Sequence, residues 1–285
     1  MSIIMLDMLI DFHNHIFPQE IIQKREDYCR LDSFFAQLYS DPRSRMATVD
    51  DLINSMDENQ IDRAVVVNIN WVNPGPCIQV NDYILDCVAR YPQRLVGLCG
   101  IPFSSDESAL KEIDKCLAQG ACGAGEIRLD LLDIPGFKST LKDVAYFITE
   151  KKFVLMLHSS EPVGHQYAGK GNATPDVLLN FIQAYPDLNI VCAHLGGGLP
   201  FYAFMPEVRK ALRNVYFDLA AVPFLYEPLV LKTINDVIHS DKLLFGSDFP
   251  LMSPGRVLQY LYAAHLDKHD LEKILGKNAA GLIPT

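Results

Sequence analysis

The sequence predicts an α/β protein of the (β/α)8 barrel class. Short, nearly all-apolar segments alternate with amphipathic helical patterns from end to end, and strands buried on both faces are typical of a parallel sheet. The segments number eight and each is followed by a helical pattern, as in a (β/α)8 barrel, within a suitable length of 285 residues. The expected strands lie at residues 8–15, 64–70, 95–103, 123–129, 153–159, 189–196, 215–220 and 242–250. We therefore expect one barrel domain over residues 1–285.

The competing architecture is an open, doubly wound sheet. That fold calls for a glycine fingerprint after its first strand, where this chain instead has His13 and His15. The glycine run Gly196, Gly197, Gly198 follows the sixth strand and lacks the spacing of a phosphate-binding loop. We interpret it as a tight turn beside a site.

Helix signals fill the gaps between the strands. Thr48 is expected to cap a helix with an acidic first turn, and Gly120 to end another. After the helix that Thr48 caps, helices are expected at residues 81–91, 108–119, 139–150, 175–185, 206–213, 228–240, 254–265 and 270–282, and Gly120 ends the second of these.

Two connections exceed the usual loop length. Residues 17–47 hold several aromatic side chains and predict a helical insert or lid after the first strand. Residues 161–173 are polar and glycine-rich, and they carry His165 and Lys170. Loops that follow barrel strands build the active site, so both segments are candidates for substrate contact.

The composition excludes several classes of protein. The net charge is -10, which argues against nucleic acid as the main partner. No apolar run approaches the roughly 18 residues that a membrane span needs, and the N-terminus lacks the basic leader of a signal peptide. The seven cysteines are scattered and mostly set among apolar neighbours, as expected of reduced thiols. We expect a cytoplasmic enzyme that acts on a small molecule.

Candidate metal ligands gather at the ends of the expected strands. His13 and His15 lie two residues apart on one expected strand, so their side chains point to the same face and can bind one ion together. Histidines and carboxylates crowded in one pocket are costly unless a cation or hydrogen bonds satisfy them. The full set of strand-end candidates is His13, His15, Glu126, His158, His194 and Asp248.

These residues resemble the amidohydrolase superfamily, over nearly the whole chain. The segments at 11–15, 193–198, 245–250 and 274–280 look like the amidohydrolase-2 branch, which includes aminocarboxymuconate-semialdehyde and resorcylate decarboxylases. Glu126 instead looks like the glutamate of TatD-type hydrolases, which bridges two metals.

The resemblance implies roles for the ligands. His13, His15 and Asp248 would bind the principal ion, with His158 as a further ligand and His194 orienting water and substrate. In two-metal relatives His158 and His194 bind the second ion and Glu126 bridges. We favour one ion over two. Ligands without thiolate suit Zn²⁺, and Mn²⁺ is possible. A homodimer is possible from the resemblance alone.

Two reactions are open. In the first, hydrolysis of a C–N or ester bond, Asp248 accepts a proton from a metal-activated water, while His194 helps to hold the oxyanion. In the second, non-oxidative decarboxylation of an aromatic or muconate-like acid, the metal binds the carboxylate of the substrate, and either a protonated Asp248 or a metal-bound water gives a proton to carbon. A TatD-like nuclease is a weaker alternative, since the chain has no basic groove.

Four side chains are candidate substrate contacts. Arg128 could clamp a carboxylate, with a barrel-rim ion pair as the equal alternative. Trp71 could wall a planar substrate together with Phe103, although ordinary packing is slightly favoured. His165 and Lys170 are expected to contact substrate from their loop.

Overall fold

Eight parallel strands form one sheet in the chain order β1 to β8. We describe residues 8–102, 108–131 and 136–284 of a computed structural model. The strands are β1 (Ile10–Asn14), β2 (Arg63–Val67), β3 (Leu95–Cys99), β4 (Ala121–Ile127), β5 (Val154–Leu157), β6 (Asn189–Cys192), β7 (Val215–Asp218) and β8 (Leu243–Leu244).

The sheet closes on itself through the backbone that follows β8. The Phe12 amide donates to the Phe245 carbonyl at 2.8 Å, and the Asp248 amide donates to the His13 carbonyl at 2.9 Å. A parallel bridge joins Asn14 to Phe249. The predicted (β/α)8 barrel is therefore confirmed.

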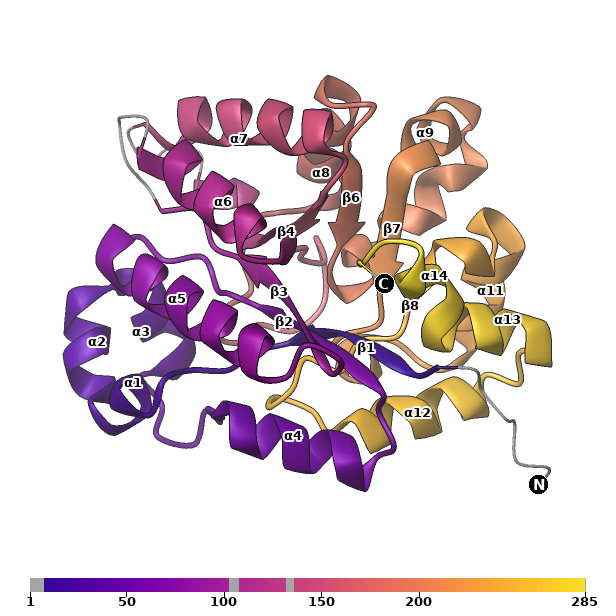
Figure 1. The fold of residues 1–285 in the computed structure, drawn as a ribbon. Coiled ribbons are helices and arrows are strands. Elements are labelled where there is room, and N and C mark those ends of the chain that lie inside the picture. The colour runs from indigo at the N-terminus through magenta and orange to yellow at the C-terminus, as the bar shows by residue number, and fades with distance from the viewer. Residues whose placement is uncertain (1–7, 103–107, 132–135, 285) are drawn as a thin grey trace.

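The helices surround the strands (Figure 1). They are α1 (Gln19–Gln23), α2 (Arg25–Leu31), α3 (Ser33–Tyr39), α4 (Val49–Glu58), α5 (Pro74–Arg90), α6 (Ser108–Ala118), α7 (Phe137–Lys151), α8 (Pro175–Ala184), α9 (Pro206–Ala211), α10 (Val222–Leu225), α11 (Leu229–Ile238), α12 (Pro254–Ala263), α13 (Lys268–Glu272) and α14 (Asn278–Ala280). Thr48 caps α4 as predicted, in a capping box with Asp51.

The barrel interior is a packed apolar core. Along β2, Val65 and Val67 belong to the interior cluster, whereas Ala64 and Val66 face the helices, as expected when side chains alternate. Ala279 and Ile283 join the interior cluster from the C-terminal segment. In Figure 1 the C-terminus accordingly lies near the middle of the barrel.

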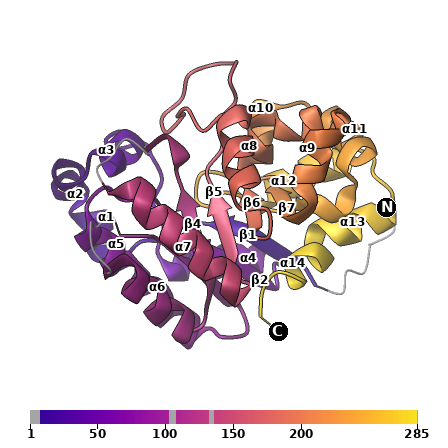
Figure 2. The ribbon, with the colours of Figure 1, turned by 90° about the horizontal axis from the view of Figure 1, so that it is seen from above.

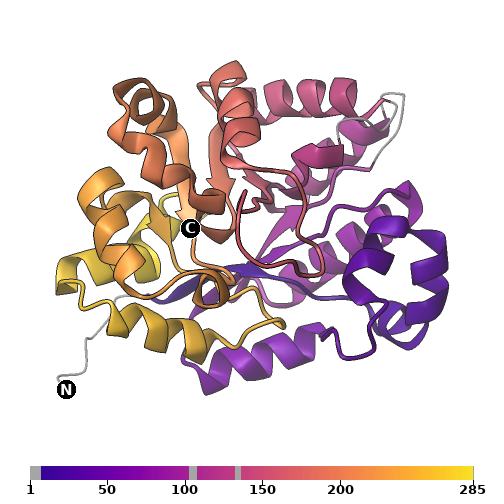
Figure 3. The ribbon, with the colours of Figure 1, turned by 180° about the vertical axis from the view of Figure 1, so that it is seen from behind.

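The predicted insert after β1 is present and helical. Helices α1, α2 and α3 lie together beside α5 (Figure 1). Buried Asp32 fastens the insert, because its carboxylate accepts from the Phe35 amide at 2.8 Å and from the Val72 and Asn73 amides at 2.7 Å each. The loop at 161–173 approaches the insert from the other side (Figures 2 and 3).

Some predicted boundaries were wrong. Helix α5 begins at Pro74, not at residue 81, because the Asn73 side chain caps it and Pro74 suits a first helical position. Strand β8 has only two residues. After it, the Phe245 amide donates to the Ile274 carbonyl at 2.9 Å, and the backbone turns at Asp248, where φ is 62°. The tail at 270–282 divides into the end of α13, a π turn at Lys273–Lys277, and α14.

Candidate metal centre and active-site cavity

Six potential metal ligands meet at the carboxyl ends of the strands, in two groups of three. One group is His13, His15 and Asp248, and the other is Glu126, His158 and His194. Within each group the ligand atoms lie within 4.8 Å of one another. The strand-end residues that the sequence singled out as ligands are therefore brought together around one cavity.

The imidazoles of His13 and His15 are oriented so that both Nε2 atoms face each other. His13 Nδ1 lies 2.8 Å from Asp218 Oδ2, and His15 Nδ1 lies 2.9 Å from the Val67 carbonyl oxygen. A carbonyl can only accept, so His15 Nδ1 carries a hydrogen and Nε2 presents a lone pair in the neutral ring. The two Nε2 atoms are 3.0 Å apart. Metal-binding histidines are typically anchored in this way through the other nitrogen.

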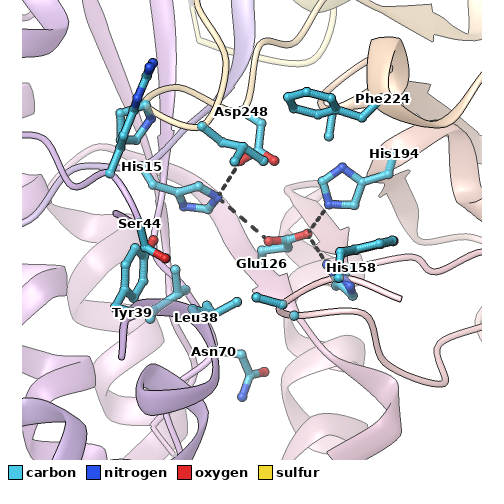
Figure 4. Close-up of a pocket in the computed structure, with 18 of the residues that line it drawn as sticks. His15, Leu38, Tyr39, Ser44, Asn70, Glu126, His158, His194, Phe224 and Asp248 are labelled. Atoms are coloured by element: carbon cyan, nitrogen blue, oxygen red, sulfur yellow. Dashed lines mark hydrogen bonds and ion pairs between the residues drawn. The ribbon is translucent and has the colours of Figure 1, made fainter. Parts of the chain in front are cut away.

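Glu126 lies between the two groups (Figure 4). Its Oε1 is 2.8 Å from His158 Nδ1 and 3.4 Å from His194 Nε2. Its Oε2 is 3.8 Å from His13 Nε2 and 3.9 Å from His15 Nε2. One carboxylate thus turns an oxygen towards each group, which is the position of a bridging ligand.

Burial and mutual contact shift the pKa values of the clustered side chains strongly. Burial opposes the charged form of His13, but Asp218 and the other carboxylates outweigh it and raise the pKa to about 9. His194 is likewise penalised by burial, yet Glu126 raises its pKa to about 10. Burial lowers the pKa of His15 and of His158. Glu126 is penalised by burial too, but the neighbouring histidines hold its pKa well below the usual range. Such clustered perturbations are typical of functional sites.

One expected ligand lies apart from its expected partners. His158 was expected to join His13, His15 and Asp248 on a principal ion, whereas it is grouped in the structure with Glu126 and His194. Its role as a ligand of the principal ion, and the choice between one ion and two, stay predictions.

Asp218 is a site residue that the sequence analysis missed. It is fully buried at the end of β7. Its Oδ1 accepts from the His194 amide at 2.9 Å and from the Ala220 amide at 3.1 Å, while its Oδ2 anchors His13. The signal that found the other ligands, a carboxylate at a strand end, would have found it.

The glycine run forms the predicted tight turn. Residues Leu195 to Gly198 have positive φ values between 55° and 93°. A Cβ on Gly197 would lie 2.3 Å from the Ser160 carbonyl oxygen, so only glycine fits there. The turn lets the chain leave β6 sharply just after His194.

A cavity of about 440 Å³ opens over the cluster, within the usual range for small-molecule sites. Its lining includes five of the six candidate metal ligands: His15, Glu126, His158, His194 and Asp248. Apolar walls come from the insert, which supplies Phe34, Leu38 and Tyr39, and from the segments after β2, β7 and β8, which supply Ile69, Ala221, Phe224, Leu225, Pro250 and Leu251. In Figure 4, Tyr39 and Ser44 lie on the side of His15, and Phe224 lies near Asp248 and His194.

Arg128 lines the cavity but is already bound within the protein. Its Nε and a terminal nitrogen hold Asp130 at 3.0 and 2.6 Å, and the other terminal nitrogen donates to the Gly169 carbonyl at 2.6 Å. The guanidinium also lies over the Phe34 ring, 4.6 Å from its centre. The rim ion pair is therefore what the structure shows, and the carboxylate clamp is not.

Trp71 does not line the cavity. It is fully buried, stacks on Phe35 with ring centres 4.8 Å apart, and donates from Nε1 to Asn68 Oδ1 at 3.0 Å. The expectation that it walls a substrate was wrong, and the packing interpretation is correct. Phe103, its suggested partner, lies outside the described residues.

The two loop candidates differ. His165 lines the cavity, where it could reach a substrate. Its contact with substrate stays a prediction. Lys170 does not line it, because its Nζ is bound to the carbonyls of Val163 and His165 at 2.9 and 3.1 Å. Lys170 therefore ties the loop together instead of facing a substrate.

The profile of the amidohydrolase family matches residues 10–284. The chain belongs to the amidohydrolase family. The resemblance noted in the sequence is confirmed, and it extends over essentially the whole barrel.

Relatives of this amidohydrolase carry more specific names. A 2-amino-3-carboxymuconate-6-semialdehyde decarboxylase of Dictyostelium discoideum is 22% identical, over 95% of this chain and 90% of its own. A gamma-resorcylate decarboxylase of a Polaromonas strain is also 22% identical, over 84% and 89%. A dihydroxybenzoic acid decarboxylase structure from Polaromonas, with bound manganese and the inhibitor 2-nitroresorcinol, shares the fold with a TM-score of 0.72, at 19% identity over 96% of both chains.

Two further observations concern membrane-spanning helices and the cysteines. Among the described residues, no helix is both long enough and apolar enough to cross a membrane. All seven cysteines are free, and all but half-buried Cys29 are buried.

Proposed function

We propose that this amidohydrolase is a metal-dependent decarboxylase of a small aromatic or muconate-like acid. One observation carries the proposal: six strand-end ligands gather at the base of a largely apolar cavity. The relatives named as decarboxylases of such acids support this reaction over hydrolysis, which the sequence analysis placed first. A planar acid suits a pocket walled by Phe34, Tyr39 and Phe224.

The donor set fits a divalent cation. The facing Nε2 atoms of His13 and His15 gain from a positive charge between them, and Asp248 Oδ1 lies 3.5 Å from His15 Nε2. We propose that His13, His15 and Asp248 hold one ion, and that Glu126, His158 and His194 hold a second, with Glu126 turned towards both. Imidazole and carboxylate donors suit Zn²⁺, and relatives with bound manganese support Mn²⁺. When bound, the metal would act as a Lewis acid that attracts the carboxylate of the substrate.

The protein side chains then do three things. The apolar walls exclude water from the ring of the substrate. The centre orients the carboxylate so that its bond to the ring carbon can break and carbon dioxide can leave. The Asp248 carboxyl, which lines the cavity, gives its proton to the same carbon, so the hydrogen replaces the lost carboxylate.

The test is carbon dioxide release from a panel of hydroxybenzoic and muconate-like acids by protein loaded with Mn²⁺ or Zn²⁺. We expect release that a chelator abolishes and that Asp248→Asn lowers by at least about 100-fold. Asp187→Asn, on the surface, is the matched control. Carbon dioxide release that persists in full in metal-free protein would contradict the proposal.

Hydrolysis of a C–N or ester bond is the second candidate. The two-group arrangement with a central Glu126 favours it, because paired ions are common in hydrolytic centres. The products separate the reactions, since hydrolysis consumes one water and releases no carbon dioxide. A homodimer and a cytoplasmic location stay predictions.

A further inference from the structure

A second hollow continues the mouth of the active-site cavity. It measures about 370 Å³ and shares Ser44, Arg45, Phe224 and Leu251 with the main cavity. Its other lining residues are Arg43, Met252, Ser253 and Arg256. Three arginines and no carboxylate thus line one hollow of a protein whose net charge is -10.

Two of these arginines are free to bind a ligand. Throughout the described part of the chain, every arginine except Arg45 and Arg256 has a carboxylate or carbonyl partner. Arg43 belongs to the bound set, since Asp41 holds its Nε and a terminal nitrogen. The two free guanidinium groups therefore lie at the same opening.

The free arginines come from two segments far apart in the sequence. Arg45 ends the insert that follows β1, whereas Arg256 lies in the first turn of α12. The Arg256 guanidinium lies over the Phe224 ring, 4.6 Å from its centre, and this stacking orients its planar group. Phe224 lines both hollows, so the apolar wall of the cavity leads directly to the positive charge.

The cavity is thus divided along its length. The metal centre lies at its base, aromatic and aliphatic side chains form its middle, and guanidinium groups stand at its mouth. The other two arginines of the lining are occupied, Arg43 by Asp41 and Arg128 by Asp130 and Gly169. A ligand that matches this order has an acid group, an apolar body and a second anionic group.

We propose that Arg45, assisted by Arg256, binds a second carboxylate of the substrate and makes the enzyme selective for diacids. This inference rests on the proposed function, because the first carboxylate is the one that is lost. A guanidinium fork matches a carboxylate in two parallel hydrogen bonds. A monoacid whose one carboxylate lies at the metal centre has no second carboxylate to form them.

The experiment compares two acids that differ only in the second carboxylate. One is a hydroxybenzoic acid, and the other bears a further carboxylate across the ring from the first. We expect wild-type protein to favour the diacid, and Arg45→Ala to lower kcat/KM for the diacid about 10- to 100-fold through KM. The kcat/KM for the monoacid should not change in Arg45→Ala. Arg45→Lys should lose part of the preference for the diacid over the monoacid. Arg256→Ala should lose less of this preference than Arg45→Ala. Arg30→Ala, on exposed α2 and paired with Asp27, is the control.

Direct titration of the same acids into metal-loaded protein separates this inference from the proposed reaction. A diacid that binds tightly through Arg45 but releases no carbon dioxide supports the arginine site and refutes decarboxylation. Equal binding of both acids, no binding of either, or an equal loss for both in Arg45→Ala would overturn the arginine site. Tighter binding of a phosphate-bearing counterpart than of the diacid would overturn the assignment to a carboxylate.

Discussion

The Nε2 atoms of His13 and His15 lie 3.0 Å apart, each aimed at the other because the opposite ring nitrogen is held from behind. Asp218 holds His13, and the Val67 carbonyl holds His15. Two lone pairs at this distance repel one another unless a proton or a cation lies between them. The centre is therefore built to hold a positive charge.

The role of Asp218 is to position His13. In Asp218→Asn the amide nitrogen can face His13 Nδ1, which would then have to accept and leave its hydrogen on Nε2. We expect metal affinity to fall about 10- to 100-fold. Competition with a chelator measures the affinity, and the circular dichroism spectrum reports whether the fold is kept. Unchanged affinity in a folded variant would show that His13 needs no such anchor.

The metal-free protein should become less stable as the pH rises from about 6.5 to 9. The pKa of His13 is raised in the folded protein, from 6.5 to about 9. The folded state therefore holds a proton that the unfolded state releases, and this stabilisation is complete below pH 6.5 and is lost through pH 9. Thermal midpoints with a chelator measure it. Saturating Mn²⁺ should weaken the trend, since the ion replaces the proton, and a midpoint that rises over this range would contradict the assignment.

Metal stoichiometry tests the two-group arrangement. We expect saturated protein to hold two ions per chain, and the double variant with His158→Ala and His194→Ala to retain one. The pair His239→Ala and His265→Ala, both exposed, is the control. Saturation of wild-type protein at one ion would restore the one-ion interpretation.

Asp32 should be important for stability and for the shape of the cavity. In Asp32→Ala the Phe35, Val72 and Asn73 amides lose their acceptor. We expect the free energy of unfolding to fall by about 1–3 kcal/mol, measured by denaturant unfolding. KM should also rise, because α3 supplies part of the cavity wall. Asp27→Ala, on exposed α2, should change neither, and an equal effect of both variants would contradict this role.

Much of the fold and of the ligand set was predictable from the sequence. Apolar runs mark buried parallel strands, and the carboxyl ends of such strands converge, so His13 and Asp248 were expected to meet although 235 positions separate them. The resemblance offered both a one-ion and a two-ion division of the six ligands. The sequence could not decide between them, because the choice depends on how the side chains lie across the barrel mouth.

The substrate contacts were harder to predict. Arg128 and Lys170 have the right chemistry, but partners in the loop at 161–173 occupy them. Trp71 follows a strand end, yet the insert covers it with Phe35. Arg45 was overlooked, because only the folded chain shows that it lies at the opening and has no charged or carbonyl partner among the described residues.

The most direct test of the central claim is elemental analysis of the His13→Ala and His15→Ala double variant, with turnover measured on the same sample. His269→Ala, on the surface, is the control. We predict that the double variant loses metal from the His13, His15 and Asp248 group and loses carbon dioxide release with it. Retained turnover in a double variant that has lost this ion would contradict the account.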